Sequence, residues 1–290
     1  MTAIESAGLT DVGKKREENE DRYLVDDEQR LYLVADGMGG HLAGEVASSM
    51  VVETVRASIQ ELCDGAPEAP AEADETLSSD ANRLLAGIRA ANRAVVERAR
   101  QEEQCRGMGS TVAAIYYADS TIIAANLGDS PIYLVRRGEI EPLYVPHTLV
   151  AEQAAIDPER AKLLEERFHH VITRAIGVAE EAFPDVCEVP FFPGDIIILC
   201  SDGLSNMVSP EEICDIVGNN NPEAACRLLV DLANERGGDD NITVIVLRGL
   251  AVQKQHILLR ILLNIMERCK LYYNKIIYKM EGWSNADIDT

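Results

Sequence analysis

The sequence predicts an α+β fold in which the sheets are antiparallel. Segments typical of strands outnumber those typical of helices, and neighbouring strand segments are often joined by tight turns. The 290 residues are 47% hydrophobic and 26% charged, which is typical of a folded globular chain with room for one large domain or two small ones. No internal repeat of fixed period is visible.

Seven segments rich in aliphatic and β-branched residues are predicted to be strands. Three of them end directly at a Gly-Asp or Asp-Gly pair, and these are residues 31–35, 121–126 and 196–200. The other four are residues 111–117, 132–136, 186–191 and 242–247. The stretch 136–139, which contains a glycine, is predicted to be a hairpin turn.

Helical periodicity falls between these strands. Apolar residues at three- and four-residue spacing predict helices over 45–61 and 81–103. Residues 64–79 are rich in Pro, Ala and acidic side chains without periodicity, which predicts a loop. Three shorter helices, each with a proline near its first turn, are expected at 157–167, 210–217 and 222–236.

The charge and the cysteines exclude several classes of protein. Lys and Arg total 27 against 49 Asp and Glu, a net charge of −22, which excludes general attraction to nucleic acid or to anionic lipid. The seven cysteines form no C-x-x-C pair, so neither a zinc ribbon nor a dithiol redox motif is indicated. No apolar run is long enough for a membrane span, and no secretory signal is visible, so we expect a reduced, cytoplasmic protein.

The composition changes near residue 250, which predicts a main domain over 1–249 and a basic tail over 250–290. Residues 257–280 would place apolar side chains along one face of an amphipathic helix. Three uses of such a helix are open: docking on its own domain, binding a partner or a second copy, and lying on a membrane surface.

Acidic residues gather at predicted strand ends. Asp36 and Asp202 each follow an apolar strand and precede a glycine, Asp129 follows Gly128, and Asp240 comes just before the last strand. A single Asp-Gly pair is more often a turn than a metal site. Several carboxylates at one edge of a sheet, however, would repel one another and need protons or cations. Without His or Cys ligand spacing, Mg²⁺ or Mn²⁺ is expected rather than zinc.

Other catalytic classes lack their motifs. The glycines of residues 36–45 fit neither G-x-G-x-x-G nor the phosphate-binding loop G-x-x-x-x-G-K-[ST]. No G-x-S-x-G sequence is present, and no cysteine has an arginine six residues later, so catalysis by a seryl or cysteinyl nucleophile is not supported. A structural calcium loop, D-x-[DN]-x-[DN]-G, is also absent.

Seven short motifs in a fixed order closely resemble the metal-dependent PPM/PP2C protein phosphatases of the bacterial type. They are R-x-x-N-E-D at 16–21, V-A-D-G-M-G-G-H at 34–41, G-S-T at 109–111, N-L-G-D-S at 126–130, T-R-A-I-G at 173–177, S-D-G-L at 201–204 and D-N-I-T at 240–243. The resemblance covers residues 6–248 and implies a central sandwich of two antiparallel β-sheets flanked by α-helices. It also implies a flap at about 145–172, where the sequence departs from the family pattern.

The resemblance implies a set of metal ligands. Asp36 is similar to the carboxylate that bridges two metal ions, with the Gly37 carbonyl as a further ligand. Glu20 resembles the ligand of one ion, and Asp202 and Asp240 resemble the ligands of the other.

Five further residues have implied roles around these ions. Asp129 resembles a ligand of a third, weaker ion, and Asp21 would orient a metal ion or its water. Arg16 is the expected phosphate clamp, since a planar guanidinium can bind two phosphate oxygens. His41 and Asn241 are expected beside the metal site, with Asn241 orienting ligands through hydrogen bonds.

The implied activity is hydrolysis of phosphoserine and phosphothreonine in proteins by a water activated between two Mn²⁺ or Mg²⁺ ions. The expected partners are phosphorylated proteins, with a bacterial Ser/Thr protein kinase as the functional counterpart. The alternative is a catalytically weak phosphoprotein-binding module of the same fold.

Overall fold

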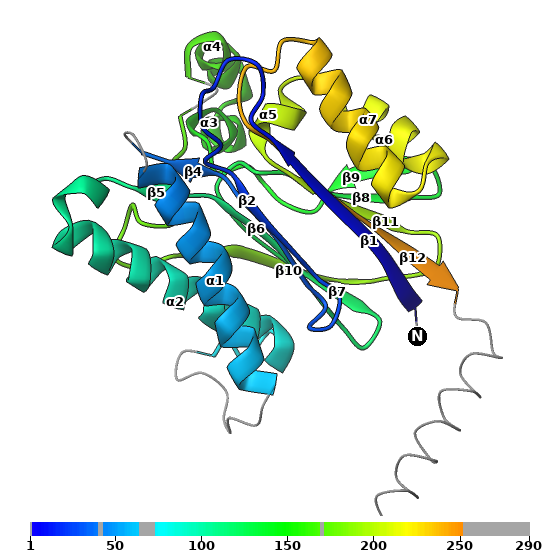
Figure 1. Ribbon diagram of the computed structural model, residues 1–290, viewed down its shortest axis with the longest axis horizontal. Coiled ribbons are helices and arrows are strands. Elements are labelled where there is room, and N and C mark those ends of the chain that lie inside the picture. The colour runs from blue at the N-terminus through cyan, green and yellow to red at the C-terminus, as the bar shows by residue number, and fades with distance from the viewer. Residues whose placement is uncertain (1, 40–42, 64–72, 169–170, 252–290) are drawn as a thin grey trace, which may run out of the picture. The chain divides into compact units, whose positions relative to one another are not determined.

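The computed structural model describes residues 2–39, 43–63, 73–168 and 171–251 (Figure 1). One five-stranded sheet has the order β1 (Thr2–Asp11), β12 (Ile242–Ala251), β11 (Ile196–Cys200), β8 (Ile132–Arg136), β9 (Glu139–Pro142). The other has the order β10 (Asp185–Pro190), β7 (Thr121–Leu127), β6 (Val112–Ala118), β3 (Leu31–Ala35), β2 (Arg22–Asp26). A short ladder joins β4 (Gly37–Met38) to β5 (Gly109–Ser110).

The two sheets pack face to face around an apolar core. Strand β3 contributes Tyr32 and Val34 to this core, where they meet residues of β11 and β12 such as Leu199 and Ile245. Alternate residues of β3, including Leu33, face the opposite way and pack under helices. All five residues of β3 are buried, so this strand appears in the sequence as a continuous apolar run.

Helices cover both outer faces of the sandwich (Figure 1). Helices α1 (Ala43–Cys63) and α2 (Ser79–Gln101) pack on the sheet that contains β3. Helices α6 (Pro210–Asn219) and α7 (Pro222–Glu235) pack on the sheet that contains β11 and β12. The sequence therefore predicted the α+β class, the antiparallel sheets and these four helices correctly.

Local capping explains where several helices begin. The Ser78 hydroxyl accepts a hydrogen bond from the Ala81 amide at the start of α2. Helix α6 begins with a capping box in which Ser209 and Glu212 bond to each other's backbone amides. The prolines predicted near helix starts occupy first-turn positions, as Pro222 does in α7.

The flap region contains two helices, α3 (Leu149–Ile156) and α4 (Pro158–Phe168), where the sequence predicted only the second. Figure 1 shows both at the same end of the sandwich as the short helix α5 (Asp202–Ser205). A single 3₁₀ turn, η1 (Glu103–Cys105), follows α2.

The amphipathic helix predicted at 257–280 lies outside the described residues. Of the predicted tail, 250–290, the structure describes only residues 250 and 251, which are the last two residues of β12. In the part of the chain that the structure describes, no helix is long and apolar enough to cross a membrane.

Candidate active site

The antiparallel pairing brings the predicted acidic strand ends to one end of the sandwich. The start of β2, the end of β3 and the end of β7 lie together because each neighbouring strand runs in the opposite direction. The end of β11 likewise pairs with the start of β12. These strand ends carry residues 20–21, Asp36, Asp129, Asp202 and Asp240, which come from five distant parts of the sequence.

Asp36 is at the centre of this group. Its pKa is raised well above the usual range by burial and then by repulsion from four other carboxylates: Asp21, Asp202, Asp129 and Asp240. Asp36 also lies within hydrogen-bonding reach of the Asp202 carboxylate. The structure therefore places these five predicted site residues close enough to interact electrostatically.

The pKa values of three neighbouring carboxyl groups, Asp129, Asp202 and Glu20, are raised as well. Burial, followed by the charge of Asp202, raises the pKa of Asp129 to about 6. The pKa of Asp202 is raised by burial and then by Asp240. Burial also raises the pKa of Glu20, and the nearby Arg16 partly opposes this rise. Without a cation, the site therefore favours protonated carboxyl groups.

The oxygen atoms present fit a hard divalent cation. One side-chain oxygen of Asp21 and one of Asp202, Oδ1 in each, are buried and have no hydrogen-bond partner in the part of the chain that the structure describes. Buried carboxylate oxygens without partners are costly, and carboxylate oxygens are the ligands that Mg²⁺ and Mn²⁺ prefer. Among the described residues, no three acidic, His or Cys side chains are already arranged around a single ion position.

Arg16 is paired with one of these carboxylates. Its guanidinium Nη2 donates to Asp240 Oδ2 at 2.7 Å, so Arg16 and a cation bound by Asp240 would share this carboxylate. The Arg16 side chain is 52% exposed and lies at the open edge of the carboxylate group. The loop that carries it is fixed by hydrogen bonds from the Lys14 and Lys15 amides to the Gly238 carbonyl.

Asp21 is buried and ties the two sheets together. Its Oδ2 accepts hydrogen bonds from the Ser201 hydroxyl at 2.8 Å and the Thr243 hydroxyl at 2.6 Å. Ser201 and Thr243 belong to the motifs at 201–204 and 240–243, but their hydrogen bonds to Asp21 were not predicted. Ser201 directly precedes Asp202, and Thr243 lies three residues after Asp240 in the same short motif, which was the available signal, because nearby hydroxyls can satisfy buried carboxylates.

Asn241 fixes the loop that carries Arg16 and Glu20. Its Oδ1 accepts from the Glu20 amide at 2.8 Å, and its Nδ2 donates to the carbonyls of Val12 and Glu18 at 2.9 Å each. This amide is therefore shared between the start of β12 and the loop before β2.

The backbone around Asp36 is held by Thr111. The Thr111 hydroxyl accepts from the Asp36 amide at 3.0 Å, and the Thr111 amide donates to the Asp36 carbonyl at 2.8 Å. Gly37, the next residue, packs so closely that an added Cβ would lie 2.2 Å from the Gly44 carbonyl oxygen. Only glycine fits there. His41 lies outside the described residues.

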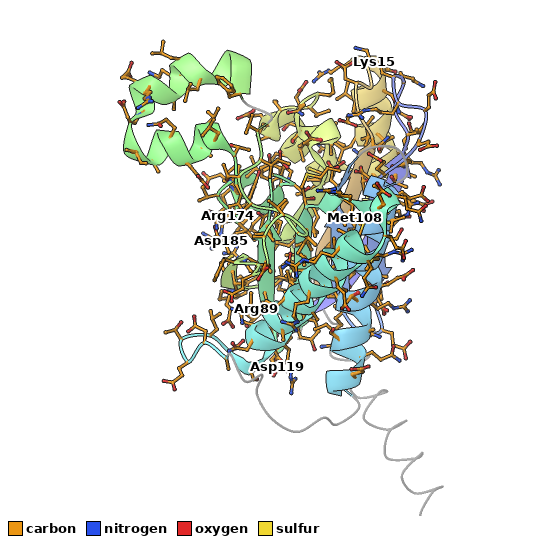
Figure 2. All side chains as sticks on the ribbon, turned by 90° about the vertical axis from the view of Figure 1, so that its left-hand side faces the viewer. Lys15, Arg89, Met108, Asp119, Arg174 and Asp185 are labelled. Atoms are coloured by element: carbon orange, nitrogen blue, oxygen red, sulfur yellow. The ribbon has the colours of Figure 1, made fainter. Side chains whose placement is uncertain are left out.

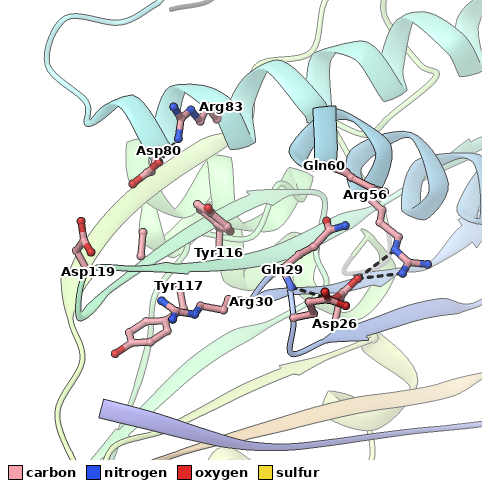
Figure 3. A pocket seen from close by; sticks show the side chains of 12 residues that line it. Asp26, Gln29, Arg30, Arg56, Gln60, Asp80, Arg83, Tyr116, Tyr117 and Asp119 are labelled. Atoms are coloured by element: carbon pink, nitrogen blue, oxygen red, sulfur yellow. Dashed lines mark hydrogen bonds and ion pairs between the residues drawn. The ribbon is translucent and has the colours of Figure 1, made fainter. Parts of the chain in front are cut away.

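A cavity of about 620 Å³ opens at the other end of β2, β3 and β6 (Figure 3). Its lining includes Asp26, which pairs with Arg56 from α1, together with Arg30 and Tyr117. None of the carboxylates around Asp36 lines it. The acidic site and this cavity are thus separate features.

Comparison with known proteins gives the family. A family model described as protein phosphatase 2C matches residues 11–242. The serine/threonine phosphatase stp of Listeria welshimeri is 36% identical over 252 residues, which cover 84% of this chain and 96% of that protein.

Solved structures agree with the fold described above. The serine/threonine phosphatase PstP/Ppp of Mycobacterium tuberculosis has a TM-score of 0.74 and 32% identity, covering 87% of this chain and 100% of that one. The catalytic domain of PstP in complex with two manganese ions has a TM-score of 0.70 and 33% identity, with the same coverage. The chain therefore belongs to the protein phosphatase 2C family and is a protein serine/threonine phosphatase of the bacterial type.

Proposed function

We propose that this chain hydrolyses phosphoserine and phosphothreonine in proteins with two divalent cations, Mn²⁺ or Mg²⁺, held by the carboxylates around Asp36. The observation that carries the proposal is the raised pKa of Asp36 amid four other carboxylates, two of which have buried oxygens that no described residue hydrogen-bonds. Such a group is stabilised when divalent cations neutralise it.

Each ligand has an assigned place. Asp36 would bridge the two ions, and the Gly37 carbonyl would be an additional ligand. Glu20 would bind one ion, while Asp202 and Asp240 would bind the other. When bound, the cations would activate a water for attack on phosphorus and neutralise charge on the phosphoryl oxygens.

Two residues around the ions orient rather than react. Asp21 is held by two hydroxyls, and its other oxygen is buried without a partner among the described residues, so this oxygen would position a cation or its water. Asn241 keeps Glu20 in place through the Glu20 amide. Asp129 would hold a third ion more weakly.

Arg16 would clamp the phosphate. It pairs with Asp240, and its exposed guanidinium is free to turn outward. A guanidinium can then donate two parallel hydrogen bonds to phosphoryl oxygens and stabilise their charge in the transition state.

The substrates are expected to be products of a bacterial Ser/Thr protein kinase that this phosphatase opposes in the cytoplasm. The support is chemical: such kinases use ATP to make the phosphoserine and phosphothreonine that a serine/threonine phosphatase removes.

The test is phosphate release from a phosphothreonine peptide with Mn²⁺ and with EDTA. We expect turnover only with Mn²⁺, and a fall of at least roughly 100-fold in Asp36→Asn, as expected when a principal electrostatic element is removed. Asp26→Asn is the matched control, because Asp26 is also a buried carboxylate but lies at the other end of β2.

Turnover that survives EDTA or the Asp36→Asn change would contradict the mechanism. Tight binding of the phosphopeptide by folded, Mn²⁺-saturated wild type without any phosphate release would instead favour the phosphoprotein-binding module.

A further inference from the structure

His147 is a fully buried residue that lies between β9 and the flap helix α3. Its Nδ1 accepts a hydrogen bond from the Gly128 amide at 3.1 Å, and its own amide donates to the Gly128 carbonyl at 3.0 Å. One residue thus binds both the amide and the carbonyl of Gly128, and the next residue along the chain is Asp129.

Gly128 has a conformation that needs such support. Its φ of +121° is rarely adopted by other residues, and an added Cβ would lie 2.7 Å from the Thr111 side chain. Glycine is the residue that loses most conformational freedom on folding, so the direction in which Asp129 leaves β7 depends on contacts that hold Gly128. His147 supplies two of them.

The other ring nitrogen of His147 connects to the flap. Because Nδ1 accepts from a backbone amide, Nε2 carries the proton and donates to Asp185 Oδ2 at 3.0 Å. Asp185 also accepts from Arg174 at 3.3 Å, and Arg174 lies 3.8 Å from Glu152 of α3. Glu152 in turn accepts from the Thr173 hydroxyl at 2.7 Å.

The pKa shifts of His147 and Asp185 are consistent with these hydrogen bonds. Burial lowers the pKa of His147, so the ring is neutral at pH 7. Burial favours protonation of Asp185, but the hydrogen bond from His147 and the charge and hydrogen bond of Arg174 outweigh it and lower its pKa. Figure 2 shows Arg174 and Asp185 side by side below α3 and α4.

From this chain of contacts, we propose that His147 is a positioning residue that couples the flap to Asp129. The ring holds Gly128 on one side and the Asp185–Arg174 pair on the other, so a shift of α3 reaches the turn that carries Asp129. The consequence for catalysis rests on the proposed function, in which Asp129 holds the weaker cation. The coupling itself does not.

Two substitutions separate the two ring nitrogens. His147→Asn keeps a carbonyl oxygen near the position of Nδ1, so the Gly128 amide retains an acceptor. His147→Gln keeps an amide donor near the position of Nε2 but loses that acceptor. Asp185→Ala leaves the ring in place and removes the residue that fixes its orientation. Asp26→Asn again serves as a buried carboxylate outside the network.

The decisive readout is hydrogen exchange of the Gly128 amide in metal-free protein, relative to amides of β6. We expect exchange at least roughly 10-fold faster in His147→Gln, a smaller increase in Asp185→Ala and in His147→Asn, which both keep an acceptor for the Gly128 amide but lose the contact with Asp185, and exchange close to wild type in Asp26→Asn. Equal acceleration in the Asn and Gln variants would mean that His147 only fills space. No acceleration in Asp185→Ala would break the link to the flap. Either result overturns the proposal.

A second readout uses the active enzyme. His147→Gln should need more Mn²⁺ for half-maximal turnover, and His147→Asn, which keeps the acceptor for the Gly128 amide, should need less than His147→Gln. If wild type has no turnover, the proposed function fails while the exchange experiment still decides the coupling. If turnover is normal and exchange is unchanged in every variant, the coupling fails alone.

Discussion

The pH dependence of stability should reveal the carboxylate group without any assay of activity. Asp129 is partly buried, and its pKa is raised from 3.8 to about 6 in the folded protein. The folded state therefore binds more protons than the unfolded state between these values. Stability from this group is complete below the unfolded pKa and is lost as the pH rises through the folded pKa.

The size of this effect follows from linkage. Raising the pH from about 5.5 to about 8 should remove about 0.8 kcal/mol of unfolding free energy through Asp129 alone. His147 acts in the opposite direction, because its lowered pKa makes the unfolded state the stronger proton binder. Because His147 is present in both wild type and Asp129→Asn, its contribution cancels when the unfolding free energies of the two proteins are compared.

The assay is urea unfolding in EDTA at several pH values and constant ionic strength. Between about pH 5.5 and about pH 8, the unfolding free energy of Asp129→Asn should rise by about 0.8 kcal/mol relative to that of wild type. Mn²⁺ should stabilise wild type most at the high end of the range, because cations bind ionised carboxylates. A difference between the two proteins that does not change with pH, or that changes in the opposite direction, would refute the reasoning.

Two further substitutions test the packing and the charges of the site. Gly203→Ala would place a Cβ 2.1 Å from the Asn241 carbonyl, so we expect a loss of about 1–3 kcal/mol in urea unfolding, whereas Gly218→Ala, with open space around it, should not lose stability. Destabilisation of both to the same extent would contradict the close approach. Arg16→Ala should leave the melting temperature nearly unchanged, because its ion pair with Asp240 is exposed, but should raise the KM for a phosphopeptide. An unchanged KM would exclude Arg16 as the phosphate clamp.

The buried strands were readable from the sequence, whereas of the edge strands in the two described sheets β10 was predicted, as residues 186–191, and β1, β2 and β9 were not. Strand β3 is buried on both faces, so its apolar run and its end at Asp36 stand out. Strands β1 and β2 lie at the edges of their sheets, and their mixture of polar and apolar residues hides them. Helix α3 was missed because none of its residues is buried, which leaves no amphipathic pattern to detect.

One part of the candidate site could likewise be predicted from the sequence, and another part could not. The acidic strand ends could be predicted because each is marked by a short motif, and antiparallel pairing then brings them together. The network through His147 could not be predicted. Its members, Gly128, His147 and Asp185, are far apart in the sequence, and each has an ordinary role when considered alone. Only the folded arrangement shows that they share hydrogen bonds.

The most direct test of the central claim, that the carboxylates around Asp36 hold the catalytic cations, is calorimetric titration of Mn²⁺ into metal-free wild type and Asp36→Asn. The account predicts at least two ions per wild-type chain and a loss of affinity of at least roughly 10-fold for both in the variant, since Asp36 would bridge them. Unchanged stoichiometry and affinity in folded Asp36→Asn would contradict it.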